Sequence, residues 1–283
     1  MDEALATTLI SKHFPKISIN KIKKIGEGTG NIAFEVNTDN IFRFPKGSEN
    51  QKRLEREISI QAILKKYSPL PIPEFIFIPI DHSFVGYKKL PGNPLLNNYN
   101  QFEDWSSFSK QLGKFLSRLH TIPGRELAGV NLLRETRSFK DWLRHSQIYF
   151  EKTKSLIPQC HLQKIEMFFS STFSDNLENP VLCHNDLGIE HILIIENKVT
   201  GIIDWGGTAL TDPACDFARI YRDVGVKLLN KVLAEYSNTM INKEKLRRRA
   251  IFYGKCLVFE DLHFGKNQKE YLDKALAALT WMF

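Results

Sequence analysis

Apolar residues form short runs in the first third of the chain and recur at helical spacing in most of the rest. Residues 3–13 are predicted to form an amphipathic helix that ends before Pro15. A second helix is predicted over residues 49–66, where Leu54, Ile58 and Ala62 repeat at helical spacing. Around these two helices the apolar runs predict five strands, at residues 17–25, 32–36, 41–44, 74–80 and 83–90.

The second part of the chain is predicted to be mostly helical. Apolar residues from Trp105 to Leu119 form one stripe, which predicts a helix with Asn100 as its N-cap. Pro91-Gly92 separates the two parts, so we expect an N-terminal lobe over residues 1–90 and a C-terminal lobe over residues 91–283. Further helices are predicted near residues 139–150, 162–173, 225–236, 243–264 and 268–282.

One β-hairpin is predicted within the helical part. Residues 192–195 and 199–203 are apolar runs joined by the polar turn Glu196-Asn197-Lys198. A hairpin here returns Asp204 toward the loop that holds Asp186 and His191. Two carboxylates and one imidazole are therefore expected at one end of a small sheet.

This grouping suits phosphoryl transfer. That reaction uses a carboxylate to orient and deprotonate the attacking hydroxyl, and oxygen or nitrogen ligands to hold Mg²⁺ on the nucleotide phosphates. The kinase catalytic loop places a metal ligand five residues after its Asp and a distant Asp-aromatic-Gly later, as His191 and Asp204-Trp205-Gly206 do here. We expect Asp186 to be the catalytic base and His191 and Asp204 to bind Mg²⁺. The alternative is a hairpin with exposed acids.

A glycine cluster, Gly26-Glu27-Gly28-Thr29-Gly30, lies between two predicted strands. It is not a Walker A loop, because no Gly-Lys-Ser/Thr closes it, and it is not a dinucleotide fingerprint, because a strand follows it. Strand–glycines–strand is the context of the kinase nucleotide loop, whose backbone N–H groups approach phosphates. A plain glycine hairpin is the alternative.

Composition narrows the function further. The 283 residues are 42% hydrophobic and 25% charged, as in ordinary globular proteins, with a formal charge of +7. The one dense basic cluster, residues 243–249, is interrupted by Glu244 and Leu246, so we expect a solvated helix face rather than a nucleic-acid site. The four cysteines include no C-x-x-C pair and are expected to be reduced core thiols. No apolar run approaches the roughly 20 residues that span a bilayer, so we expect no membrane association and a cytoplasmic protein.

The stretch from 181 to 207 closely resembles the aminoglycoside phosphotransferase family, and most of all the 2″-aminoglycoside phosphotransferases. These are small-molecule kinases built on the protein-kinase plan, and a His or Asn occupies the position of His191. The resemblance implies an α+β, two-lobed protein-kinase-like fold. Its N-terminal lobe has a five-stranded antiparallel sheet with one main helix, and its C-terminal lobe is mostly helical with a catalytic hairpin. Only residues 207–212 separate Asp204-Trp205-Gly206 from the next helix, which leaves no room for a peptide-binding activation segment. A small acceptor is therefore favoured.

The resemblance also implies a nucleotide site. Alignment places Arg43 where kinases hold the α- and β-phosphates, with Glu57 as its partner and Lys46 as the alternative phosphate ligand. The N–H groups of residues 28–30 lie above the phosphates. The base is expected against the connector from Lys88 to Leu90, and the bulky Tyr87 stands at a gatekeeper position. Relatives with Tyr there tend to disfavour adenine, so GTP is predicted over ATP.

The acceptor site is defined less sharply. In the family, inserted helices, here at residues 125–175, shape this site, and Asp216 helps to hold the catalytic loop. An aminoglycoside carries several ammonium groups and needs converging carboxylates. Beside Asp186, we expect these from Asp223, Glu260 and Asp261.

Other functions stay open at this point. Trp205, in place of Phe, also resembles macrolide kinases of the same superfamily, so a macrolide 2'-phosphotransferase or another small-alcohol kinase is the alternative. A non-catalytic nucleotide-binding module is the alternative from a different class. Such a module would normally lack Asp186 or Asp204, and the chain contains both.

Overall fold

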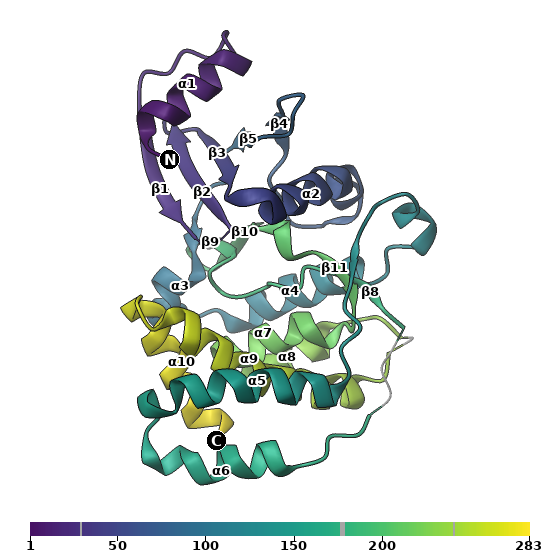
Figure 1. Cartoon of the computed structure of the whole chain (residues 1–283). Coiled ribbons are helices and arrows are strands. Elements are labelled where there is room, and N and C mark those ends of the chain that lie inside the picture. The colour runs from purple at the N-terminus through teal and green to yellow at the C-terminus, as the bar shows by residue number, and fades with distance from the viewer. Residues whose placement is uncertain (29, 176–178, 240) are drawn as a thin grey trace.

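The computed structural model describes residues 1–28, 30–175, 179–239 and 241–283. It has two parts, a small upper part built on a sheet and a larger, mostly helical lower part (Figure 1). The predicted α+β, two-lobed fold is confirmed. The upper part contains α1 (Glu3–His13), β1 (Ile22–Glu27), β2 (Asn31–Val36), β3 (Asn40–Pro45), α2 (Gly47–Tyr67), β4 (Phe75–Phe77) and β5 (Val85–Lys88).

The five strands form one antiparallel sheet in the order β1-β2-β3-β5-β4. Alternate residues of a strand face opposite sides of a sheet. Phe34, Phe42 and Phe44 therefore pack against α1 on one face. Ile41 and Tyr87 pack on the other face with Leu54 of α2. Arg43 shares this second face, and that places it beside α2.

Three strands are shorter than the sequence predicts. The first begins at Ile22 rather than at residue 17, although Ile17 and Ile19 still pack against the apolar cluster under α1. The last two strands cover only Phe75–Phe77 and Val85–Lys88. Outside these strands, Ile78 and Phe84 still pack in the apolar clusters of the sheet, whereas Ile80 is fully exposed. Pro79 cannot donate a ladder hydrogen bond.

The lower part begins with β6 (Asn93–Pro94) and α3 (Leu95–Asn98). Its α4 begins at Trp105, and Asp104 caps it by accepting a hydrogen bond from the backbone N–H of Ser107. The prediction of an N-cap at Asn100 is therefore wrong. The remaining elements are α4 (Trp105–Leu119), β7 (Leu133–Arg134), α5 (Phe139–Thr153), α6 (Gln159–Ser170), β8 (Val181–Cys183), β9 (Ile192–Ile195), β10 (Lys198–Ile202), β11 (Ala209–Thr211), α7 (Ala214–Val224), α8 (Val226–Glu235), α9 (Lys243–Gly265) and α10 (Lys269–Met282), with short 3₁₀ turns between some of them.

The predicted hairpin is present as β9 and β10, which pair antiparallel. The connector after β5 is fixed to this hairpin. β6 pairs with β9, and the Thr200 hydroxyl donates to the carbonyl of Pro91 at 2.6 Å. Gly92 has φ +104°, and a Cβ there would lie 2.6 Å from the carbonyl oxygen of Ile194, so only glycine allows this close approach. The lobe boundary at residues 90 and 91 stays a prediction.

Two predictions from composition need correction. Most of the basic cluster on α9 is exposed, but Arg249 is fully buried and its Nε lies 2.7 Å from the Asp212 carboxylate. Cys183, Cys215 and Cys256 are buried as predicted, whereas Cys160 is exposed on α6. Among the described residues, no helix is both long enough and apolar enough to cross a bilayer.

Candidate active site

The loop after β8 is hydrogen-bonded to a buried carboxylate on α7. Asp216 accepts hydrogen bonds from the backbone N–H groups of His184 (3.1 Å) and Asn185 (2.7 Å). Its Oδ2 also lies 3.1 Å from Nε2 of the buried His120. Asn185 has φ +63°, a left-handed conformation that asparagine adopts more readily than most residues other than glycine. Asp216 therefore supports the catalytic loop through hydrogen bonds, as the sequence suggested.

His184 joins this loop to the strand that precedes Asp204. Its Nε2 lies 3.0 Å from the carbonyl oxygen of Ile203, and its Nδ1 lies 3.3 Å from the backbone nitrogen of Asp186. A carbonyl only accepts and an amide only donates, so Nε2 carries the proton and Nδ1 accepts. Burial lowers the pKa of His184, which keeps the ring neutral. The residue therefore organises the loop and is not free to bind a metal.

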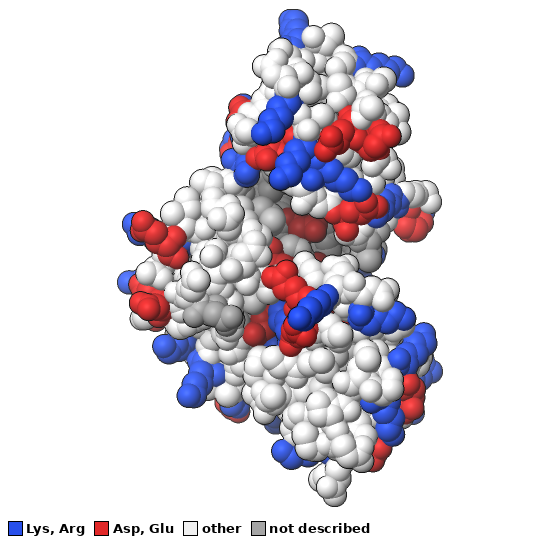
Figure 2. All heavy atoms as spheres, turned by 90° about the vertical axis from the view of Figure 1, so that its left-hand side faces the viewer, with Lys and Arg blue, Asp and Glu red and all other residues white. Residues whose placement is uncertain are grey.

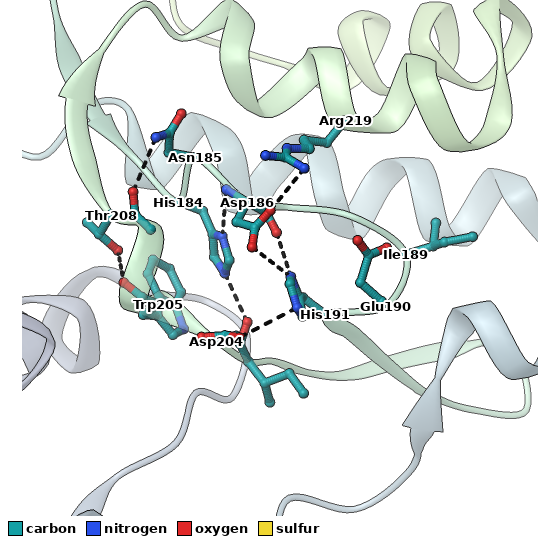
Figure 3. A network of polar contacts seen from close by, with 12 residues as sticks. His184, Asn185, Asp186, Ile189, Glu190, His191, Asp204, Trp205, Thr208 and Arg219 are labelled. Atoms are coloured by element: carbon teal, nitrogen blue, oxygen red, sulfur yellow. Dashed lines mark hydrogen bonds and ion pairs between the residues drawn. The ribbon is translucent and has the colours of Figure 1, made fainter. Parts of the chain in front are cut away.

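His191 lies between the two predicted catalytic carboxylates (Figure 3). Its Nδ1 is 3.7 Å from Oδ2 of Asp186, and its Nε2 is 3.7 Å from Oδ2 of Asp204. The three side chains come from the β8–β9 loop and from the end of β10, as the hairpin predicts. The spatial relation that the sequence predicted is therefore present.

Charges around this trio keep both acids ionised. Burial alone would raise the pKa of Asp186, but Arg219 and then His191 outweigh it and lower that pKa. Burial likewise opposes ionisation of Asp204, and Arg43 and His191 lower its pKa. The pKa of His191 is raised despite burial, because Asp186, Asp204 and Glu190 favour its protonated form. Without a bound cation, His191 can supply the positive charge between the two acids.

The donor set fits a divalent metal ion. Nδ1 of His191 lies 2.7 Å from the backbone carbonyl oxygen of Asp186 and must donate to it. This bond fixes the tautomer, so that the neutral ring turns the lone pair of Nε2 toward Asp204. A histidine held in this way by a carbonyl, next to an ionised carboxylate, is typical of a metal ligand. Residues 191 and 204 could therefore hold one ion together.

Arg43 links the sheet to this site. Its Nη1 lies 2.9 Å from Oε1 of Glu57, and its Nη2 lies 3.2 Å from Oδ1 of Asp204. Burial would lower the pKa of Arg43, but Glu57 and Asp204 outweigh it and raise that pKa, so the guanidinium stays charged. The predicted pairing with Glu57 is therefore present in the geometry.

Lys46 contacts the glycine loop. Its Nζ donates to the carbonyl oxygen of Gly28 at 2.9 Å and lies 2.7 Å from Glu27. Its backbone N–H donates to the carbonyl of Gly30 at 2.9 Å. Lys24 and Lys46 together lower the pKa of Glu27 to about 2. Lys46 therefore braces the loop, whereas Thr29 lies outside the described residues.

The connector borders a hollow between the two parts of the molecule. Lys88 and Leu90 line an open pocket of about 570 Å³, together with Ile195 of the hairpin. Figure 2 shows this side of the molecule, where acidic atoms lie deep in a cleft and basic side chains follow its upper rim. Tyr87 is buried behind the connector, and burial raises its pKa to about 12, so the phenol is neutral.

Helix α7 turns one face toward the catalytic loop. Asp216, Arg219 and Asp223 are spaced i, i+3 and i+7, which places them on one side of a helix. Asp216 holds residues 184 and 185, Nη1 of Arg219 lies 3.1 Å from Oδ1 of Asp186, and Asp223 accepts the N–H of Ile189 at 2.9 Å. Arg219 was not predicted as a site residue. Its spacing of one turn from Asp216 is the signal that identifies it.

Asp223 does not reach the acceptor side. Its side chain is fully buried, with Nε of Arg222 at 2.7 Å and Nζ of Lys274 at 3.2 Å. Both cations also hold Glu190, at 3.2 Å and 3.1 Å. The expectation that Asp223 contacts the acceptor directly is therefore corrected, because these neighbours close it off. The network ties the catalytic loop to α7 and α10.

The two other predicted acceptor carboxylates lie on α9. Asp261 is 22% exposed at its side chain and lies 3.1 Å from Nε of Arg222. Glu260 is partly exposed, and it influences the pKa values of Arg219, Arg137 and Tyr149.

Replacing Asp216 by Asn is expected to destabilise the fold and to misplace the catalytic loop. The new NH₂ group replaces one carboxylate oxygen, so it faces one or two of the hydrogen-bond donors and leaves them unpaired, which costs about 3–5 kcal/mol. The melting temperature should then fall by roughly 10 °C. Scanning calorimetry checks this against Asp273→Asn, which changes an exposed carboxylate on α10. Equal melting temperatures for the two variants would show that Asp216 does not hold the loop.

Residues 21–250 match the family model described as "Phosphotransferase enzyme family". The GDP and kanamycin complex of APH(2″)-IIia is similar over 98% of this chain and 98% of that chain, with 26% identity and a TM-score of 0.82. The GDP complex of wild-type aminoglycoside 2'-phosphotransferase-IIIa is similar over 99% and 98%, with 25% identity and a TM-score of 0.81. Macrolide 2'-phosphotransferase type I shares the fold over 99% and 98%, with 19% identity and a TM-score of 0.69.

Proposed function

The chain belongs to the phosphotransferase enzyme family and transfers phosphoryl groups to a hydroxyl acceptor, and from that premise we propose that it phosphorylates an aminoglycoside with GTP as donor. One observation carries the proposal, namely that His191 lies 3.7 Å from both Asp186 and Asp204. This spacing gathers a base and a metal-binding pair at one point of the cleft.

In this proposal Asp186 is the catalytic base. It accepts a hydrogen bond from the acceptor hydroxyl and takes its proton as the hydroxyl oxygen bonds to the γ-phosphorus. The bond from that phosphorus to the oxygen bridging to the β-phosphate breaks, and the nucleoside diphosphate leaves. Because its pKa is lowered, Asp186 is ionised before the acceptor binds. Its main contribution is then orientation of the hydroxyl.

The other predicted residues serve the nucleotide. Asp204 and His191 would hold Mg²⁺, which neutralises charge on the β- and γ-phosphates when bound. Arg43, kept in place by Glu57 at 2.9 Å, would bind phosphate oxygens with its charged guanidinium. The backbone N–H groups of residues 28–30 would lie above them, and Lys46 would keep that loop in place.

The preference for GTP rests on the connector. We assign the base to the backbone from Lys88 to Leu90, with Tyr87 filling the space behind it. The two similar structures named above, at 26% and 25% identity, are GDP complexes, which supports a guanine nucleotide. ATP is the alternative donor.

The choice of an aminoglycoside rests on the similar structure that contains kanamycin and on Glu260 and Asp261. A second candidate, a macrolide, is favoured by one observation. Most acids near the acceptor side are already paired with cations of the chain, namely Asp186 with Arg219, and Asp261 with Arg222. A polycation gains less from carboxylates that are already neutralised, whereas a largely apolar acceptor needs fewer of them.

A nucleotide-consumption screen tests the proposal. Purified protein with Mg²⁺ and either GTP or ATP is offered kanamycin, a macrolide, choline or homoserine, and the release of diphosphate is measured. We expect turnover with kanamycin and higher kcat/KM with GTP than with ATP. Turnover with the macrolide alone would show that the acceptor is a macrolide and not an aminoglycoside. A higher kcat/KM with ATP than with GTP would contradict the proposed GTP preference. Nucleotide binding without turnover on any acceptor would favour a non-catalytic module.

A further inference from the structure

Arg219 is the one cation on α7 that reaches the base directly. Its Nη1 lies 3.1 Å from Oδ1 of Asp186, and its side chain is 18% exposed. In Figure 3 the guanidinium points from α7 toward Asp186, on the side of this carboxylate away from Asp204. Burial would lower the pKa of Arg219, but Asp186 outweighs it and raises that pKa, so the group is charged.

The position of Arg219 relative to the reacting atoms follows from its contact with Asp186. A base accepts the hydroxyl proton at about 2.6–3.2 Å, and Arg219 is one hydrogen bond away from the same carboxylate. The acceptor oxygen therefore lies about two hydrogen bonds from the guanidinium, through the Asp186 carboxylate. This group has five N–H donors, and its contact with Asp186 is made through Nη1.

The four cations near the catalytic loop differ in which acids they contact. Arg43 lies on strand β3 and forms hydrogen bonds with both Glu57 and Asp204. Arg222 and Lys274 are engaged behind the loop with Asp223 and Glu190. Among these four cations, Arg219 alone touches the base, and its side chain is the most exposed, at 18%. In phosphoryl transfer, an arginine at this location can neutralise charge on the group in transit.

We propose that Arg219 is a catalytic arginine supplied by the chain itself, which binds the γ-phosphoryl group while it passes to the acceptor oxygen next to Asp186. The hydroxyl proton goes to Asp186, the bridging oxygen departs with the diphosphate, and Arg219 neutralises charge on the equatorial oxygens without gaining or losing a proton. The inference rests on the proposed function. The competing role is a positioning residue that acts only through Asp186.

A double-mutant cycle separates the two roles. The probe is GDP with Mg²⁺, with and without aluminium fluoride, which mimics the phosphoryl group in transit and should bind more tightly than GDP alone. Affinities are measured by calorimetry for the wild type, Arg219→Gln, Asp186→Asn and the double variant. Arg219→Lys tests recovery by charge alone, and Arg118→Gln on the exposed face of α4 is the control.

We expect GDP affinity to change less than about threefold in every variant, which also shows that each variant folds. The gain from aluminium fluoride should fall about 10²-fold in Arg219→Gln, and by a similar factor when Asp186 is already Asn. Arg219→Lys should recover only part of the gain, because lysine keeps the positive charge but lacks the fork geometry of arginine. An effect of Arg219→Gln that disappears in the Asp186→Asn background would overturn the inference. A wild type without any fluoride-dependent gain would instead contradict the proposed function, and the inference with it.

Discussion

Asp186→Asn is expected to lower kcat about 10²–10⁴-fold while nucleotide affinity stays nearly unchanged. Asparagine keeps the shape of the side chain but cannot take the hydroxyl proton. The contacts that place the loop come from the backbone of residues 184, 185 and 189, and they survive the change. The ion pair with Arg219 at 3.1 Å weakens, which adds to the loss of turnover.

Steady-state kinetics with the acceptor found in the screen measures this effect. The KM for the nucleotide and the melting temperature should match those of the wild type, and Asp273→Asn serves as the surface control. Retained turnover in Asp186→Asn would show that another group, or water alone, orients the acceptor hydroxyl.

Asp204→Asn is expected to remove the dependence of nucleotide binding on Mg²⁺. Asp204 has φ +62°, where Ala is strained but Asn is tolerated, so Asn isolates the loss of charge from a change in backbone. Removing a partner of a ligating group typically costs 10–100-fold in metal affinity, and loss of a ligand itself should cost more. Arg43 keeps its bond to Glu57, so metal-independent nucleotide binding should persist.

Calorimetric titration of GDP with and without Mg²⁺ measures this dependence. In the wild type and in Asp273→Asn, Mg²⁺ should tighten binding, and in Asp204→Asn the two titrations should coincide. An unchanged effect of Mg²⁺ in Asp204→Asn would mean that the ion is held elsewhere in the protein.

The sequence predicts those parts of the site that local patterns determine. Two apolar runs and a polar turn are sufficient to predict the hairpin, and the hairpin is sufficient to bring Asp204 beside His191. The pairing of Arg43 with Glu57, by contrast, was implied by the resemblance to the kinase plan, and the structure places the two side chains 2.9 Å apart.

The parts that were missed depend on contacts between distant segments. Asp223 is an acid at an expected position, but Arg222 and Lys274 bury it, and Lys274 comes from a helix 50 residues later. Arg249 belongs to a charged run, yet Asp212 draws it into the core. The pattern of charged residues alone does not show which residue of a charged segment forms an ion pair in the protein core.

The sharpest test concerns the shared ion between His191 and Asp204. Mn²⁺ can replace Mg²⁺ as a spectroscopic probe, and pulsed electron paramagnetic resonance of the Mn²⁺–GDP complex detects a directly bound imidazole nitrogen. We predict a ¹⁴N coupling in the wild type that disappears in His191→Asn, in which Mn²⁺ and GDP still bind. A wild-type complex that holds Mn²⁺ and GDP without nitrogen coupling would contradict the assignment of His191 and Asp204 to one metal site.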